Sequence, residues 1–151
     1  MGVAASGEPR LWQARAWPAA ADAATILLVD GERGVRELLS AMLAVQGYRV
    51  LEADSGPEAL RLSQQHPGKI DLLLTDIMIP GMDGSELAAA FSVLRPDARV
   101  LFVSASAPVA DDRRAAVADQ ERLILKPFSR HELARHVHEA LRRGRADSEA
   151  G

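Results

Sequence analysis

The chain has 151 residues, enough for one domain with short tails, and its 48% hydrophobic and 26% charged residues are ordinary for a soluble globular protein. The net charge of −3 argues against direct binding of nucleic acid or an anionic membrane, and the absence of cysteine excludes disulfides, thiolate nucleophiles and cysteine-bound metals. No apolar run reaches the roughly 18 residues of a membrane span, and the N-terminus lacks a secretory signal. We therefore expect a cytoplasmic protein with no membrane partner.

Residues 1–24 differ in composition from the rest of the chain. They are rich in alanine and contain both tryptophans, Trp12 and Trp17, without a helical or strand period. We expect a disordered or weakly ordered leader, and a docking arm anchored by the tryptophans is the alternative. Residues 144–151 are expected to form a tail, which leaves 25–143 as the folded domain.

Strand and helix patterns alternate along the folded part. Apolar residues at helical spacing, including Leu38, follow the first strand, and later helices begin where Ser or Asp stands three residues before Glu. A weak apolar pattern over residues 107–120 predicts a loosely held helix. The predicted strands cover residues 25–30, 48–53, 70–76, 99–104 and 123–125, and the capping pairs are Ser55 with Glu58, Asp83 with Glu86, and Ser129 with Glu132.

This alternation predicts an α/β fold. Strands separated by helices form a parallel sheet covered on both faces, and right-handed crossovers leave few possible topologies. We expect a doubly wound, five-stranded parallel sheet with the flavodoxin-like order 2-1-3-4-5. Ligands of such sheets bind outside the carboxyl ends of the strands, where the winding reverses, which here is the point between the first and third strands.

Polar residues stand at four strand ends along this edge. Asp30 follows the first strand and Asp76 ends the third, while Ser104 ends the fourth and Lys126 follows the fifth. Each alone is explained as an ordinary polar strand end, but four together suggest a site. Paired carboxylates suit Mg²⁺, lysine suits a phosphoryl oxygen, and a carboxylate can itself accept a phosphoryl group.

The sequence resembles the receiver domain of two-component response regulators over residues 25–143. The segments that carry the resemblance are "ILLVDGE", "GYRVLEADSGPEAL", "DLLLTDIMIPGMDG", "VLFVSA" and "LKPF". The sequence as a whole is most similar to receivers of hybrid sensor histidine kinases. The resemblance implies that Asp76 is the phosphoacceptor and that the Lys126–Pro127 bond is cis. It also implies that Asp30, Asp76 and the backbone carbonyl of Met78 hold Mg²⁺, while Ser104 and Lys126 contact the phosphoryl group.

Two positions depart from the family pattern. The family has a second acid after the first strand as a direct metal ligand, and this chain has Gly31 there. We therefore expect weak Mg²⁺ binding unless Glu32 serves as a further ligand, and we expect Gly31→Asp to raise the affinity. The resemblance implies an aromatic residue at position 123, whose rotation reports the state of Ser104 in relatives. This chain has Leu123 there, so we expect the signal to be transmitted to an effector by another part of the domain.

These observations favour a phosphoacceptor signalling switch in a two-component phosphorelay. Asp76 would receive phosphate from a histidine kinase or phosphotransfer protein, and the chain would act on an effector protein in trans, with a homodimer as a further candidate assembly. The alternative is a phosphorylation-impaired pseudo-receiver that serves as a constitutive interaction module because Gly31 replaces an acid. An enzyme is not expected, apart from self-phosphorylation and dephosphorylation of Asp76.

Overall fold

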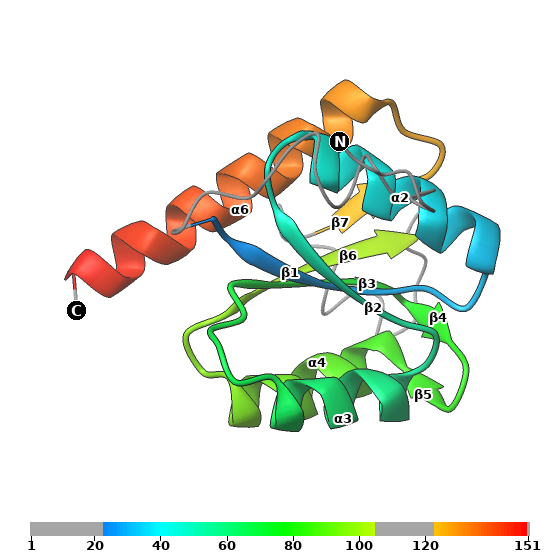
Figure 1. Cartoon of the computed structure of the whole chain (residues 1–151), viewed down its shortest axis with the longest axis horizontal. Helices are drawn as coiled ribbons and strands as arrows, with labels where there is room; N and C mark the ends of the chain where they lie inside the picture. Colours follow the sequence, from blue (N-terminus) through cyan, green and yellow to red (C-terminus); the bar gives the residue numbers. More distant parts are fainter. Residues whose placement is uncertain (1–22, 105–122, 151) are drawn as a thin grey trace, which may run out of the picture.

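A five-stranded parallel sheet lies between two layers of helices (Figure 1). The computed structural model describes residues 23–104 and 123–150, with side chains of the second stretch up to residue 143. The sheet order is β2-β1-β3-β6-β7, which confirms the predicted order 2-1-3-4-5. The elements are β1 (Thr25–Val29), α2 (Arg33–Val45), β2 (Arg49–Ala53), α3 (Gly56–Gln65), β3 (Leu72–Asp76), β4 (Met78–Ile79), β5 (Met82–Asp83), α4 (Gly84–Leu94), β6 (Arg99–Ser104), β7 (Leu123–Leu125) and α6 (Arg130–Ala150).

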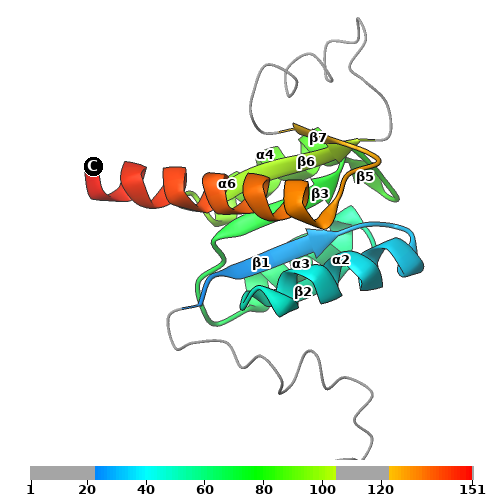
Figure 2. The same cartoon turned by 90° about the horizontal axis from the view of Figure 1, so that it is seen from above.

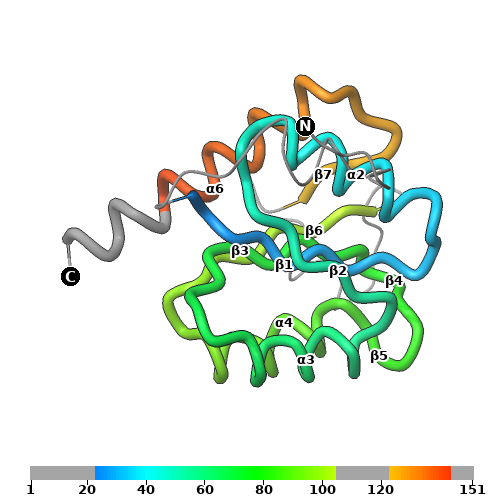
Figure 3. Tube along the Cα trace, in the orientation of Figure 1, coloured from blue at the N-terminus to red at the C-terminus, as the bar shows by residue number. Residues whose placement is uncertain are grey.

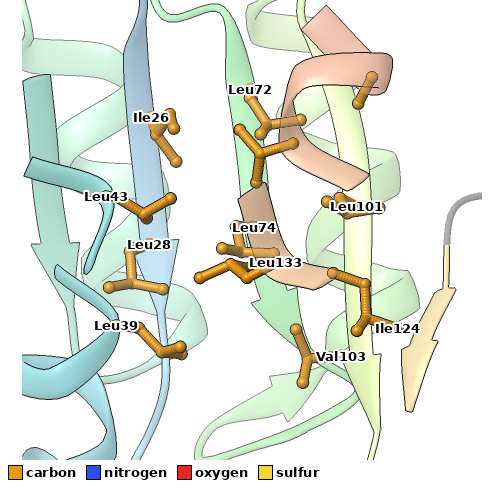
Figure 4. Packing of buried hydrophobic residues seen from close by; sticks show 12 residues of the cluster. Ile26, Leu28, Leu39, Leu43, Leu72, Leu74, Leu101, Val103, Ile124 and Leu133 are labelled. Carbon is orange, nitrogen blue, oxygen red and sulfur yellow. The ribbon is translucent and has the colours of Figure 1, made fainter. Parts of the chain in front are cut away.

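The two faces of the sheet bury separate hydrophobic clusters. Helices α2 and α6 cover one face, where α2 lies beside β1 and β2 and α6 crosses β6 (Figure 2). Figure 4 shows this cluster, in which Leu43 of α2 and Leu133 of α6 are fully buried against the central strands. Helices α3 and α4 cover the other face through Ala59, Leu87 and Phe91. Alternate residues of the buried strands serve the two clusters, as expected for strands covered on both sides.

The predicted helix starts are confirmed by their hydrogen bonds. Ser55 Oγ accepts a hydrogen bond from the backbone N–H of Glu58 at 3.3 Å. Asp83 and Glu86 form a reciprocal capping box at the start of α4. The same exchange occurs before α6, where the backbone N–H of Glu132 donates to the hydroxyl of Ser129 and the backbone N–H of Ser129 donates to the carboxylate of Glu132. These side chains satisfy backbone donors that the first helical turn leaves free.

Three features differ from the sequence analysis. Leu38 was expected to face the core, but 61% of it is exposed, because α2 turns Leu39 and Leu43 inward instead. A two-stranded antiparallel hairpin, β4–β5, occupies the segment after β3, where the sequence analysis predicted no strand. Helix α6 continues to Ala150, beyond the expected domain end at residue 143.

Other expectations concern residues outside the described part of the chain. The leader lies there up to residue 22, and so does the weak helix expected over residues 107–120. Within the described ranges, no helix has both the length and the apolar character needed to cross a bilayer.

Candidate functional site

The carboxyl ends of the parallel strands bring the predicted polar residues to one edge of the sheet. The register pairs Asp76 of β3 with Val103 of β6, and Ser104 of β6 with Leu125 of β7. Asp30 directly follows β1, which is the neighbour of β3 on its other side. Figure 3 follows the chain through the turns after β1 and β3 at this end of the sheet, where the β4–β5 hairpin also lies. Four residues separated widely in sequence therefore share one edge.

Lys126 lies between the two carboxylates of this edge. Its Nζ is 3.0 Å from Oδ2 of Asp76 and 3.8 Å from Oδ2 of Asp30. The side chains are largely shielded from solvent, with exposed fractions of 24% for Lys126, 17% for Asp76 and 5% for Asp30. The Lys126–Pro127 bond is cis, as the resemblance implied. One lysine thus neutralises part of a partly buried acid pair.

Backbone N–H groups hold the remaining carboxylate oxygens. The N–H of Glu32 donates to Oδ1 of Asp30 at 2.8 Å, and the N–H of Met78 donates to Oδ1 of Asp76 at 3.1 Å. Both bonds span two residues, so each carboxylate is fixed by the turn that follows its own strand. The acids are therefore oriented by the local backbone before any ligand arrives.

Glu32, Met78 and Ser104 lie around this centre. Glu32 is exposed at the start of α2 and makes no capping bond, and Met78 is 67% exposed in β4. Ser104 is buried, and its backbone carbonyl accepts a 2.8 Å hydrogen bond from the N–H of Lys126. Leu123 packs against the hydrophobic cluster beneath α3 and α4.

Burial raises the pKa of Asp30, and neighbouring carboxylates raise the pKa of Lys126. Burial raises the pKa of Asp30 above its usual 3.8, and the negative charges of Asp76 and Glu32 add to this, while the hydrogen bond from Glu32 and the charge of Lys126 act in the opposite direction. Burial lowers the pKa of Lys126, but its hydrogen bond to Asp76 and the three nearby carboxylates outweigh burial and raise it. The nearby carboxylates thus outweigh the cost of burying the charge of Lys126. The charge of Lys126, 3.8 Å from Asp30, does not outweigh the cost of burying the charge of Asp30.

We expect Asp30→Asn to increase the free energy of unfolding at pH 7. Because the folded protein raises the pKa of Asp30, ionisation of this acid destabilises the fold as the pH rises above the usual value of 3.8. Asparagine keeps the acceptor for the Glu32 N–H but carries no charge. Urea unfolding across pH 3–7 measures the effect: the advantage of the variant should be present at pH 7 and vanish near pH 3. A loss of stability at pH 7 would contradict the claim that the ionised carboxylate of Asp30 destabilises the fold.

The sequence analysis missed a positioning residue, Arg36. Its Nη1 donates to the backbone carbonyl of Asp30 at 2.8 Å, and its Nε is 3.5 Å from Oε1 of Glu52 in β2. The Arg36 side chain is only 16% exposed. It ties α2 to the end of β1 and to β2, which holds the turn that carries Asp30. No periodicity signals this role, because it depends on where β2 lies.

The donor set suits a magnesium ion that keeps several of its waters. Mg²⁺ is usually bound through one or two carboxylates together with water and phosphate oxygens. Asp30 and Asp76 supply this number of carboxylates, 3.0–3.8 Å from the same ammonium group. In the part of the chain that the structure describes, no group of three or more His, Cys, Asp or Glu side chains is arranged to hold a metal. The two carboxylates therefore fit a hydrated Mg²⁺.

Comparisons with known proteins agree with this geometry. Residues 26–138 match the response regulator receiver domain family. Sensor kinase CckA of Brucella abortus (strain 2308) is 37% identical over 118 residues, which cover 78% of this chain and 12% of the kinase. The response regulator receiver protein CpdR of the same organism is 33% identical over 116 residues, covering 77% of this chain and 95% of CpdR. The chain thus spans a small part of the first relative and nearly all of the second.

Solved structures give the same result. A CheY-like receiver domain protein from Methanospirillum hungatei JF-1 superposes with a TM-score of 0.73 at 26% identity, covering 83% of this chain and 98% of that protein. The receiver domain of the hybrid histidine kinase CckA has a TM-score of 0.62 at 30% identity, covering 78% and 98% respectively. The chain therefore belongs to the response regulator receiver domain family of two-component signal transduction.

Proposed function

We propose that the chain is a signalling switch in which Asp76 accepts a phosphoryl group from a histidine kinase or a phosphotransfer protein. Receiver domains in general act as signalling switches rather than as enzymes. The observation that carries the proposal is the position of Lys126, whose Nζ lies 3.0 Å from Asp76 and 3.8 Å from Asp30. A lysine held at an acid pair on a ligand-binding sheet edge is suited to neutralise a phosphoryl group.

In this proposal the chain contributes a nucleophile and two groups that stabilise charge. A carboxylate oxygen of Asp76 attacks phosphorus, the bond from phosphorus to the donor nitrogen breaks, and its electron pair returns to the imidazole of the donor histidine. Lys126 moves its hydrogen bond from the carboxylate to a phosphoryl oxygen, and the hydroxyl of Ser104 donates to another. Positioning and charge neutralisation supply the rate enhancement, as in other phosphoryl transfers.

Metal binding in this site rests on a reduced ligand set. Receiver domains generally bind Mg²⁺ at the phosphorylation site, and in this chain we assign it to Asp30, Asp76 and the backbone carbonyl of Met78. The ion would neutralise charge on the phosphoryl oxygens. The affinity is expected to be low because Gly31 lacks a side chain. Glu32 is the candidate third acid, since its charge already acts on both Asp30 and Lys126.

The phosphorylated state would act by favouring one of two conformations of the domain, which an effector protein in the cytoplasm distinguishes. Helix α2, which begins beside the turn that carries Asp30, has two exposed apolar side chains, Leu38 at 61% and Val45 at 47% exposure, and Val45 lies at the end of the helix farther from the site. No observation in the described residues favours the alternative of a constitutive module without phosphate chemistry.

Incubation with Mg²⁺ and acetyl phosphate tests the proposal. We expect the intact mass of the protein to increase by one phosphoryl group, and peptide mapping should locate the group on Asp76. Asp76→Asn should abolish the increase, because the amide cannot form the acyl phosphate. Asp71→Asn is the matched control, since Asp71 lies at the opposite end of β3 and accepts the N–H of Thr25. Absence of labelling at millimolar Mg²⁺, or equal labelling of Asp76→Asn, would refute the proposal.

A further inference from the structure

The first residue of α4 lies directly against the backbone that carries Asp76. A Cβ atom built on Gly84 would stand 2.5 Å from the carbonyl oxygen of Asp76, 2.9 Å from Cα of Ile77 and 3.0 Å from the carbonyl oxygen of Ile77. All three are backbone atoms, so none of them can turn aside as the end of a flexible side chain would. Gly84 is itself buried. Helix α4 therefore lies this close to the turn after β3 only because residue 84 has no side chain.

Hydrogen bonds hold the backbone after Asp76 from three directions. On the side of the sheet, the N–H of Ile77 donates to the carbonyl of Val103 at 3.0 Å. On the side of the helix, the N–H of Gly84 donates to the carbonyl of Ile77 at 2.7 Å. The hydroxyl of Thr75, a residue that is only 1% exposed, donates to the carbonyl of Asp76 at 2.9 Å. These bonds fix the directions of the two peptide groups that follow Asp76.

One of these peptide groups joins Gly84 to the carboxylate of Asp76. The group between Ile77 and Met78 accepts the N–H of Gly84 at its carbonyl. It donates its own N–H, that of Met78, to Oδ1 of Asp76 at 3.1 Å. Because a peptide group is planar and turns as one unit, a tilt imposed at its carbonyl is passed to its N–H. The other carboxylate oxygen, Oδ2, faces Lys126 at 3.0 Å, so such a tilt would also disturb this contact.

Helix α4 has little freedom to move away from the turn. Leu87 and Phe91 on its inner face are fully buried in the cluster beneath it. Asp83, the residue before the helix, caps α4 and pairs with Met78 in the β4–β5 hairpin. A methyl group at position 84 would therefore displace the turn after β3, or would pull on it through the hydrogen bond of Gly84. Either movement changes the direction of the peptide group that holds the Asp76 carboxylate.

We propose that Gly84 and Thr75 are positioning residues for phosphoryl transfer, which fix the backbone after Asp76 and thereby orient its carboxylate toward the phosphoryl group. This proposal rests on the function proposed above, in which Asp76 is the phosphoacceptor. Neither residue touches the phosphoryl group, since both act through backbone peptide groups. A misplacement of a reacting group by about 1 Å can slow a reaction by roughly 10²-fold, so small displacements of this backbone have measurable effects.

The rate at which acetyl phosphate labels Asp76 tests the role of Gly84. With Mg²⁺ present, Gly84→Ala should slow labelling by about tenfold or more. The rate is expressed per folded molecule, with the folded fraction taken from circular dichroism. Gly34→Ala is the matched control, because a Cβ on Gly34 in the first turn of α2 meets nothing within 4 Å, and it should label within about twofold of the natural protein. Equal rates for the two variants would overturn the proposal.

Variants of Thr75 give an independent test that holds if Gly84→Ala does not fold. Thr75→Val keeps the shape of the side chain but removes the hydroxyl, and it should slow labelling about fivefold, as expected for the loss of one hydrogen bond. Thr75→Ser keeps the hydroxyl and should recover most of the rate, although the loss of a buried methyl group lowers stability. A purely structural role predicts the opposite order. Labelling of Thr75→Val at least as fast as that of Thr75→Ser would overturn the proposal.

Amide proton NMR of the unphosphorylated protein measures the displacement itself. The N–H of Met78 donates to Asp76, and the N–H of Glu32 makes the same kind of bond to Asp30 at 2.8 Å. In Gly84→Ala the amide proton of Met78 should move to lower chemical shift as its hydrogen bond weakens, while that of Glu32 stays in place. An unmoved Met78 signal, or equal shifts of both signals, would overturn the proposal.

The NMR measurement also separates this proposal from the proposed function, because it requires neither Mg²⁺ nor a phosphoryl donor. Failure to label the natural protein on Asp76 would refute the proposed function and would leave the shift of the Met78 amide proton interpretable. Normal labelling of the natural protein, with Gly84→Ala labelled at the same rate, would refute the positioning role and leave the phosphoacceptor intact.

Discussion

Lys126→Met is expected to slow phosphoryl transfer to Asp76 by about 10²–10³-fold, the usual cost of removing one preorganised group that stabilises transition-state charge. The ammonium group of Lys126 lies 3.0 Å from Asp76 in a partly buried setting, where its charge is screened less than at the surface. Methionine keeps most of the length of the side chain without the charge. The rate is measured from the intact mass of the protein during incubation with acetyl phosphate and Mg²⁺.

The chain supplies a matched control for this variant in its other lysine. Lys69 is 69% exposed and lies 3.5 Å from Asp71, before the start of β3 and at the opposite end of that strand from the site. Lys69→Met removes the same charge and should leave the rate within about twofold of the natural protein, since exposed ion pairs contribute little. A Lys126→Met rate equal to that of Lys69→Met would contradict the role assigned to Lys126.

Arg95→Ala is expected to lower the free energy of unfolding by about 2–3 kcal/mol, because several charge-assisted hydrogen bonds are lost together. Arg95 follows α4, and its guanidinium donates to the backbone carbonyls of Ser63 and His66 at the end of α3 and to that of Gly68 beyond it. The two shortest of these bonds are 2.7 Å. One side chain thus joins the two helices on one face of the sheet, and urea unfolding measures its contribution.

Two further variants separate the hydrogen bonds of Arg95 from a general effect of charge. Arg95→Lys keeps the charge but cannot reach three carbonyls in a planar fork, so it should recover only part of the loss. Arg61→Ala removes an exposed arginine of α3 that pairs with Glu58 within the same helix, and it should change the free energy of unfolding far less than Arg95→Ala does, because exposed ion pairs contribute little. If Arg95→Ala were as mild as Arg61→Ala, the guanidinium would not be joining α3 to α4.

The sequence predicts the fold and the shared edge of the site because both follow from simple repeats. Buried strands separated by capped helices determine the sheet order, and parallel strands must end at the same edge. Asp76 and Lys126 were therefore expected to meet although 50 residues separate them, and their 3.0 Å contact confirms this. The helix starts were predictable for a similar reason, because capping pairs such as Asp83 and Glu86 are local in sequence.

Features that depend on the spacing between elements could not be predicted in this way. The rotation of α2 that exposes Leu38 is decided by the packing of that helix against β1 and β2. The contacts of Arg36 with Glu52, and of Arg95 with Ser63, join segments whose distance no periodicity reveals. The sequence likewise marks Gly31 only as a missing acid. The position of the Pro80 ring, 2.8 Å from where a Cβ on Gly31 would stand, depends on how the two turns pack together.

The binding of beryllofluoride in the presence of Mg²⁺ is the most direct measurement of the central claim, that Asp76, Asp30 and Lys126 together form a phosphoryl-binding site. Beryllofluoride attaches to a carboxylate and occupies the place of a phosphoryl group, so ¹⁹F NMR detects it without turnover. We predict a bound fluorine signal that requires Mg²⁺, is absent from Asp76→Asn, and is weakened in Lys126→Met. A spectrum showing only free beryllofluoride at saturating Mg²⁺, or a bound signal that survives Asp76→Asn, would contradict the claim.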